Sequence, residues 1–142
     1  MKKNQQIVTS PGGLLYVGRS PIHGRGVFAS RSIKTGVILE RCPVIKMKLE
    51  EMAVRKFMVL NYYAFMIDRQ NEYTGVALGY GSLYNHADNC NAAYYYDEEN
   101  ELMVFEALRK IHRHEEITIN YLGPDATERT INDWAQKPEL AV

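Results

Sequence analysis

Short runs of apolar and β-branched residues, separated by turn-forming residues, dominate the first third of the chain. They read LLYV, GVFAS and VILERCPVI at residues 14–17, 26–30 and 37–45. Runs of this length and composition, bounded by Pro-Gly-Gly and Lys-Thr-Gly, predict β-strands. The next segment, LEEMAVRKF at residues 49–57, predicts a short helix, because its apolar side chains recur on one helical face: Leu49, Met52, Ala53 and Phe57.

The second half of the chain continues the pattern of short strands. The run VLNYYAFMI at residues 59–67 is rich in aromatic and β-branched residues and is interpreted as a strand, while AAYYY and ELMVFEA flank the turn DEEN as a hairpin. In EEITINYL the side chains alternate with the period of a half-buried strand, Ile117, Ile119 and Tyr121 against Thr118 and Asn120. The segment TERTINDWAQK predicts a short helix that carries Trp134. Many short strands and at most two short helices predict a mainly β fold and exclude a doubly wound nucleotide-binding fold.

Composition adds limits on partners and on the compartment. The chain has 142 residues, which is most simply one domain, and 17 Lys and Arg residues balance 17 Asp and Glu residues. No strong field of either sign is implied, so direct nucleic-acid binding is not favoured. The start MKKNQQIVTSPGG has no apolar run behind its lysines, and no segment approaches the ~20 apolar residues that cross a bilayer. With only two cysteines, the composition predicts a soluble intracellular protein without a membrane partner.

The glycine motif HGRGVFA at residues 23–29 has two interpretations. Gly24 and Gly26 could form a tight turn before the strand GVFAS, or they could let a cofactor approach the backbone closely. The motif lacks the third glycine of a dinucleotide-binding fingerprint and opens no helix. Taken alone, it favours the turn.

The segment HRHEE at residues 112–116 raises the question of a metal site. A catalytic zinc site needs about three protein ligands, and the sequence specifies no third partner for His112 and His114. A solvated turn before the strand EITINY is the favoured interpretation, and a histidine-based metal enzyme stays an alternative. Cys42 and Cys90 are predicted to be packing residues, because nothing marks either thiol as activated. The three tyrosines at residues 94–96 are predicted to pack with buried rings and hydrogen-bonded hydroxyls.

The order of the motifs along the chain is more specific than any one of them. GRGVFA comes first, followed by Glu40 on the next strand, the aromatic segment YAF at residues 63–65, the pair Asn85-His86, and EEITINY, which ends at Tyr121. This order and spacing resemble the SET domain, the fold of protein-lysine methyltransferases that use S-adenosylmethionine. The resemblance runs from about residue 15 to residue 123, and the chain is most similar to the short free-standing SET domains of large DNA viruses and bacteria.

The resemblance implies a mainly β SET fold of small curved sheets with one or two short helices. The chain end would pass through a loop as a C-terminal pseudoknot, where the Asn-His segment meets the final tyrosine strand. The implied organisation is a flexible N-terminal segment (1–13), a SET domain (14–123) and a C-terminal helical segment (124–142). No cysteine-rich zinc segment follows, so no metal is implied. Trp134 on the C-terminal segment is then a candidate to cap the active site, against ordinary packing of that helix.

The resemblance also implies where the cofactor S-adenosylmethionine would bind. Asn85 would bind the amino-acid end of the cofactor, and His86 would contact the adenine mainly through backbone groups. Main-chain contacts on the other side of the cofactor would come from the glycine motif, that is from Gly24, Arg25 and Gly26.

Two tyrosines are implied as the catalytic residues. Tyr121 would lie beside the methyl-transfer channel and border the cofactor, and Tyr63 would line the channel as a second aromatic residue. The chain departs from the family pattern at Ala87 and Cys90, which replace a small polar residue and a proline. It departs again at Ile119, where a Phe or Tyr often determines how many methyl groups are added, so product specificity is not predicted.

The implied function is transfer of a methyl group from S-adenosylmethionine to a lysine amine of a protein substrate, with a histone tail as one candidate substrate. A SET-like module that binds a peptide or cofactor without catalysis is the alternative. The implied location is the cytoplasm or nucleus, or the host nucleus for a viral or effector protein. A homodimer is a further expectation, because short SET domains can complete their site by pairing.

Overall fold

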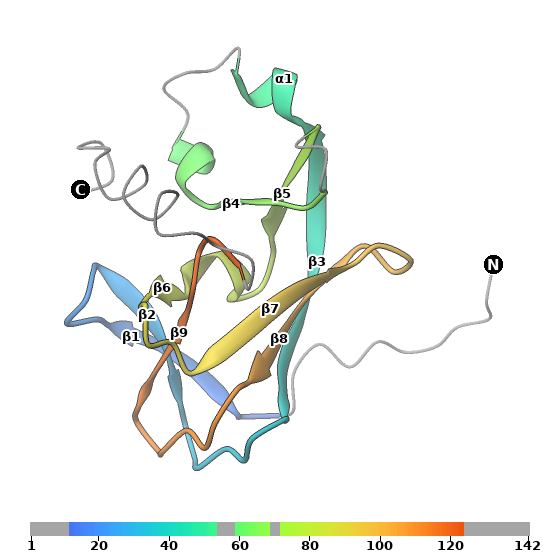
Figure 1. Cartoon of the computed structure of the whole chain (residues 1–142). Coiled ribbons are helices and arrows are strands. Elements are labelled where there is room, and N and C mark those ends of the chain that lie inside the picture. Colours follow the sequence, from blue (N-terminus) through green and yellow to red (C-terminus); the bar gives the residue numbers. More distant parts are fainter. Residues whose placement is uncertain (1–11, 54–58, 69–71, 124–142) are drawn as a thin grey trace.

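Nine short strands build two curved sheets in the part of the chain that the structure describes. This computed structural model describes residues 12–53, 59–68 and 72–123, apart from the side chains of residues 52, 53 and 61 (Figure 1). The strands are β1 (Leu15–Arg19), β2 (Arg25–Ala29), β3 (Ile38–Lys48), β4 (Ala64–Met66), β5 (Tyr73–Ala77), β6 (Asn85–His86), β7 (Ala92–Asp97), β8 (Leu102–Ala107) and β9 (Glu116–Ile119). The helical segments are α1 (Leu49–Ala53) and two 3₁₀ turns, η1 (Val59–Tyr62) and η2 (Gly81–Leu83).

The first sheet has the strand order β1-β2-β9-β6. β1 and β2 form an antiparallel hairpin, and β2 pairs antiparallel with β9. β6 pairs parallel with β9, with Asn85 opposite Thr118. The final strand therefore lies between the glycine-motif strand and the Asn-His segment, which brings three distant parts of the sequence together.

The second sheet has the order β4-β5-β3-β8-β7 and depends on the long strand β3. The first half of β3 pairs with β8 as far as Pro43, and its second half pairs with β5 from Val44 onward. A bulge between Ile38 and Glu40 shifts the register in the first half. One strand thus joins two smaller antiparallel units, and this change of partner curves the sheet (Figure 1).

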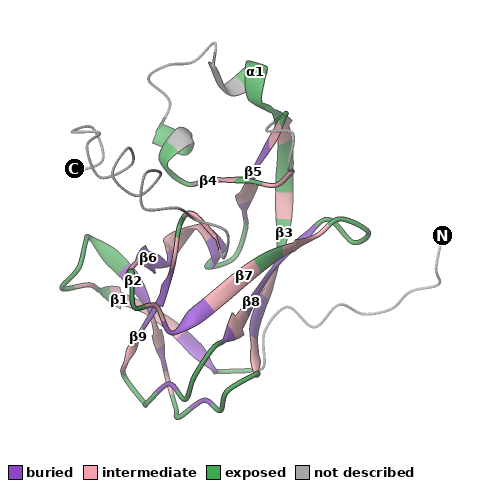
Figure 2. Ribbon diagram, viewed as in Figure 1, coloured by how far each residue is buried: buried purple, intermediate pink, exposed green. Residues whose placement is uncertain are grey.

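The hydrophobic core lies where the two sheets meet, as the buried stretches in Figure 2 show. Fully buried side chains come from both sheets, including Val27, Leu39, Phe105, Ile117 and Ile119. The ring of Phe105 stacks on that of Tyr84 at 4.4 Å between centroids. The mainly β architecture and the DEEN hairpin predicted from the sequence are confirmed.

Two predictions about local structure are wrong, and one strand has no counterpart in the sequence predictions. Residues 59–62 form η1, and only Ala64–Met66 becomes a strand, because β5 offers partners for those three residues alone. The patterns do not predict β5 at all. β9 is not half-buried, since Thr118 is buried along with Ile117 and Ile119, and the strand ends before Tyr121. Neighbouring strands and the side chain of Asn91 cover this strand, and sequence alternation cannot reveal such cover.

The three consecutive tyrosines of β7 do not share one environment. Tyr94 is half-buried and donates its hydroxyl to the backbone oxygen of Tyr121 at 2.9 Å, as expected of a packing residue. Tyr95 is 52% exposed, because alternate side chains of a strand point to opposite faces. The buried hydroxyl of Tyr96 has no hydrogen-bond partner among the described residues. The predicted C-terminal helix and Trp134 lie outside the described residues.

Candidate functional site

Asn85 holds the glycine-motif loop against the final strand. Its side-chain nitrogen Nδ2 donates to the backbone oxygens of His23 and Arg25, each at 3.0 Å, and to Oε1 of Glu116 at 2.8 Å. All three partners can only accept here, so the orientation of the amide is fixed. Its oxygen Oδ1 has no partner among the described residues, although Asn85 as a whole is only 6% exposed. The amide therefore offers one acceptor atom for a ligand.

Glu116 is the other centre of this network. Both of its carboxylate oxygens accept from Oγ of Ser20 at 2.8 Å, and Oγ in turn accepts the backbone N–H of Ile22 at 2.9 Å. A Cβ at Gly26 would collide with Oε1 of Glu116, which explains why this position of the motif needs glycine. Residues 20–26 are thus fixed at both ends by side chains of β6 and β9. We call Ser20, Asn85 and Glu116 the loop clamp.

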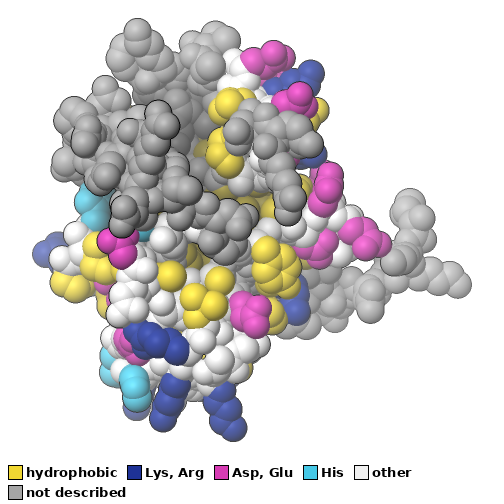
Figure 3. Space-filling model, viewed as in Figure 1, with side chains coloured by type: hydrophobic (Ala, Val, Ile, Leu, Met, Phe, Trp, Pro, Cys, Tyr) yellow, Lys and Arg dark blue, Asp and Glu magenta, His cyan; other side chains and the backbone are white. Residues whose placement is uncertain are grey.

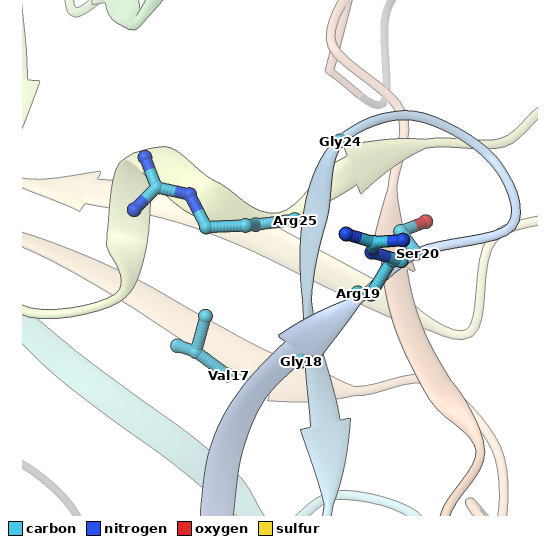
Figure 4. Close-up of a pocket in the computed structure, with 6 residues that line it drawn as sticks. All are labelled: Val17, Gly18, Arg19, Ser20, Gly24 and Arg25. Carbon is cyan, nitrogen blue, oxygen red and sulfur yellow. The ribbon is translucent and has the colours of Figure 1, made fainter.

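A pocket opens beside the clamped loop, lined by Val17, Gly18, Arg19, Ser20, Gly24 and Arg25 (Figure 4). Gly24 adopts a φ of 47°, and a Cβ there would meet no atom within 4 Å. In Figure 4 the side chain of Arg25 extends to one side of the pocket, and Arg19 lies with Ser20 on the other. Gly24 therefore has no side chain to hinder a ligand, but its carbonyl is bound by the N–H of Ser20 at 2.9 Å, as the carbonyl of Arg25 is bound by Asn85.

His86 fixes the backbone of Tyr121. The N–H of Tyr121 donates to Nδ1 of His86 at 3.1 Å, and Nε2 of His86 lies 2.9 Å from Oδ1 of Asp88. A backbone amide can only donate, so Nδ1 must carry the lone pair and the proton of the neutral ring must lie on Nε2. The two rings also contact each other, with centroids 5.2 Å apart. Asp88 thus stabilises the tautomer that positions Tyr121.

The hydroxyl of Tyr121 is fixed as firmly as its backbone. It donates to the backbone oxygen of Tyr84 at 2.9 Å. Burial of this hydroxyl, with smaller contributions from Tyr63 and Glu116, raises the pKa of Tyr121 to about 12. The phenol therefore stays protonated over the physiological range. Tyr63 is 38% exposed and follows η1, and its backbone oxygen accepts from Oγ of Ser82 at 2.9 Å.

The buried carboxylate of Glu40 supports the position of Tyr121 indirectly, through Tyr84. Glu40 on β3 is 6% exposed and accepts the hydroxyl of Tyr84 at 3.0 Å and the N–H of Tyr80 at 3.0 Å. Burial and the neighbouring Glu40 raise the pKa of Tyr84 well above its ordinary value. They also raise the pKa of the Cys42 thiol, so this cysteine is a packing residue as predicted. Glu40 positions Tyr84, and the Tyr84 carbonyl positions Tyr121.

The structure brings together most of the residues that the sequence singled out. Asn85 bonds to Arg25, His86 bonds to Tyr121, Gly26 lies against Asn85 and Glu116, and Tyr63 lies near enough to Tyr121 to raise its pKa. His112 and His114 are exposed in a turn that precedes β9, which is the solvated turn predicted for HRHEE. Among the described residues, no group of three or more His, Cys, Asp or Glu side chains could hold a metal ion. Within the same residues, no helix has the length and apolarity to cross a membrane.

Sequence reasoning missed the residues that support the site. Ser20, Tyr84 and Asp88 carry no motif signal. Asn91 closes the segment NHADNCN and could have been found there: its Oδ1 accepts the N–H of Thr118 at 2.9 Å, and its Nδ2 donates to the backbone oxygen of Glu116 at 2.8 Å. Glu116 stands in EEITINY, but nothing in that segment identifies Asn85 as its partner.

Comparison with known proteins gives one consistent result. The SET domain family matches residues 24–122. A fission yeast enzyme, the histone-lysine N-methyltransferase specific for H3 lysine-37, is 34% identical over 99 residues, which are 69% of this chain and 66% of that enzyme. The chain thus spans slightly less than two-thirds of this curated relative.

Solved structures agree with the sequence match. A Plasmodium falciparum protein assigned as a histone methyltransferase is 33% identical, with a TM-score of 0.63 over 78% of this chain and 95% of its own. The Neurospora histone lysine methyltransferase DIM-5 shares the fold, with a TM-score of 0.61 over 80% of this chain and 54% of its own at 19% identity. In the mainly β fold that these proteins share, Asn85 and His86 of this chain pair in parallel with Thr118 and Ile119, and Tyr121 follows that strand. The chain belongs to the SET domain family, whose methyltransferases use S-adenosylmethionine.

Proposed function

We propose that this chain is a protein-lysine N-methyltransferase that uses S-adenosylmethionine. The observation that carries the proposal is the fixation of Tyr121 beside the Asn-His segment. Its backbone N–H is bound by His86, and its hydroxyl is bound by the carbonyl of Tyr84. Methyl transfer is an in-line displacement, so its rate depends strongly on alignment of the two reactants, and a tyrosine fixed at both ends is suited to provide that alignment.

The residues around the clamped loop fit the cofactor's amino-acid end. The acceptor Oδ1 of Asn85, which has no partner among the described residues, suits an ammonium group. The absence of a side chain at Gly24 permits close approach, and Arg25 at the pocket offers a guanidinium for a carboxylate. When bound, S-adenosylmethionine supplies an electrophilic methyl group on a positively charged sulfur. Trp134 keeps its proposed role of covering this site.

The tyrosines would orient the lysine amine. Because the proton of the Tyr121 hydroxyl is directed at the Tyr84 carbonyl, its oxygen presents lone pairs that can accept an N–H of a neutral amine. The aromatic ring of Tyr63, close to that hydroxyl, would form a wall of the channel. A partly desolvated channel disfavours the charged form of a lysine, so no strong general base is needed.

The substrate class follows from the relatives and is part of the proposal. The fission yeast enzyme is named for lysine-37 of histone H3, and the Plasmodium protein is assigned to histones. We propose a histone lysine as the substrate here, which would place the chain in a nucleus or in the cytoplasm where histones are made. Incubation with isolated histones and radiolabelled S-adenosylmethionine, followed by mass spectrometry, tests this directly.

The expected result is label on a lysine of one histone. A matched control uses histones whose lysine amines have been chemically acetylated, and these should take up no label. The alternative of a binding module predicts cofactor or peptide binding without incorporation of label. Label on both histone preparations would place the methyl group on another residue type and would contradict the proposal.

A further inference from the structure

One end of the molecule carries a concentrated positive charge, although the chain as a whole is neutral. Lys, Arg and His side chains gather at the lower end of the view in Figure 3, where the loops after β2 and after β8 lie in Figure 1. Five exposed Lys and Arg residues come from these loops; Arg109 pairs with Glu115, and the other four are Arg31, Lys34, Lys110 and Arg113. We call these four residues the basic end. The equal numbers of basic and acidic residues in the whole chain do not reveal such a separation of charge.

The two loops are fixed side by side, so the four charges cannot move apart freely. Ile33 and Ile111 form a bridge with backbone bonds of 2.8 and 2.9 Å in the two directions. The loops continue from two paired strands, since β2 and β9 pair antiparallel with Val27 opposite Ile117. Lys34 and Lys110 each adjoin a bridge residue, and Arg31 and Arg113 lie on the same two loops, two residues from the bridge.

Like charges held on neighbouring loops repel, and this arrangement therefore has a cost in the free protein. The carboxylate of Glu115 does not offset it. Glu115 is already paired with Arg109 at 2.8 Å, and among the described residues none of the four cations of the basic end makes an ion pair. An anionic partner would relieve the repulsion, which is the reason to look for one.

We propose that the basic end binds the phosphate backbone of duplex DNA. Arg31 and Lys34 are three residues apart, so their backbone positions lie within about 10 Å of each other even in an extended chain. A DNA duplex carries one charge per ~1.7 Å of its axis, so its charge density can match that of these cations. An extended acidic peptide directs only every second side chain to one face and therefore presents fewer charges over the same length. No helix of the described residues projects from this end to read bases, so binding would be independent of sequence.

The inference goes beyond methyl transfer and is tested without cofactor or histone. Fluorescence anisotropy with a short labelled duplex, measured over a series of salt concentrations, should detect binding at low salt. Four phosphate contacts predict a slope of log K against log salt of about −3.6. The double variant Lys110→Glu/Arg113→Glu should lower the affinity by at least about 10-fold and flatten the slope by about 2.

A matched control variant distinguishes an effect of the basic end on DNA affinity from an effect of the net charge. Lys46→Glu/Lys48→Glu changes the net charge by the same amount on the second half of β3, away from the two loops, and should leave DNA affinity within about 2-fold. Both variants change exposed side chains, and their melting temperatures verify folding. Equal loss in the two variants, or no wild-type binding at low salt, would overturn the inference. Binding of polyglutamate but not of duplex would assign the surface to an acidic protein instead. None of these outcomes affects the methyltransferase proposal, because the assay contains no cofactor or histone.

Discussion

The side-chain amide of Asn85 donates to the carboxylate of Glu116 over 2.8 Å, and this bond joins the Asn-His segment to the first residue of the final strand. The same amide and the same carboxylate also hold the loop that carries the glycine motif, through its backbone oxygens and through Ser20. Asn85 therefore has a structural task as well as a proposed ligand contact. Loss of its side chain should lower stability and cofactor affinity together.

Substitution of Glu116 tests the structural task of the loop clamp without disturbing the proposed ligand contact of Asn85. Replacement by Ala removes the acceptor of Ser20 and of Asn85 without removing any proposed ligand atom. We expect affinity for S-adenosylmethionine to fall by about 10-fold, equivalent to ~1.4 kcal/mol, because the loop is no longer held. Calorimetric titration measures this change.

A double-mutant cycle provides the control for Glu116. Gly26→Ala should be strongly destabilising alone, since its Cβ would collide with the Glu116 carboxylate, and it should cost less in the Glu116→Ala background. Additive effects of the two substitutions on the free energy of unfolding would show that the clamp does not exist as described.

Asp88 is expected to act on Tyr121 through His86. Asp88→Ala should lower turnover by a few-fold, and Asp88→Asn should restore most of it, because an amide oxygen can still accept the Nε2 proton of His86. The carboxylate is exposed, so the effect on melting temperature should be small. Nitrogen NMR of the imidazole reports the tautomer directly. A wild-type ring protonated on Nδ1 would be incompatible with the bond from the Tyr121 N–H.

Cofactor binding should stabilise the fold. A ligand that binds only the native state adds RT ln(1 + [L]/Kd) to the free energy of unfolding, about 2.7 kcal/mol at 100 times Kd. We expect S-adenosylmethionine to raise the melting temperature and a metal chelator to leave it unchanged. No shift with millimolar cofactor, together with a chelator-sensitive fold, would favour the histidine-based metal enzyme.

Alkaline pH should destabilise the fold through two tyrosines, Tyr94 and Tyr121, whose hydroxyls are shielded from water. Burial raises the pKa of Tyr94 and of Tyr121 to about 12 from an ordinary value of 10.0. Between these values the unfolded chain has released protons that the folded chain retains, so stability falls as pH rises from about 10 to 12. Ultraviolet titration of the ten tyrosines should show a late-ionising group. Ionisation of all ten near pH 10 in the folded protein would contradict the burial of these two hydroxyls.

Sequence reasoning succeeded where the signal is local or ordered along the chain. The hairpin around DEEN follows from two apolar runs and their turn, and the motif order from GRGVFA to EEITINY identified the family. It failed where contacts between segments distant in the sequence determine burial and hydrogen bonding. Thr118 is buried because Asn91 and neighbouring strands cover it, and Ser20 bonds to a residue 96 positions away. No local pattern encodes such a bond, so the loop clamp and the support of Tyr121 by Tyr84 appear only in the fold.

Tyr121 carries the central claim that this site transfers a methyl group. Tyr121→Phe retains the ring against His86 but removes the hydroxyl that is bound to the Tyr84 carbonyl. Single-turnover methylation of histone at saturating S-adenosylmethionine, with a melting curve and a cofactor titration for each protein, is the most direct test. We predict a rate lowered by roughly 10²–10³-fold, the range for loss of one preorganised polar contact, with cofactor affinity nearly unchanged. A variant that folds, binds cofactor and methylates at the wild-type rate would contradict the claim.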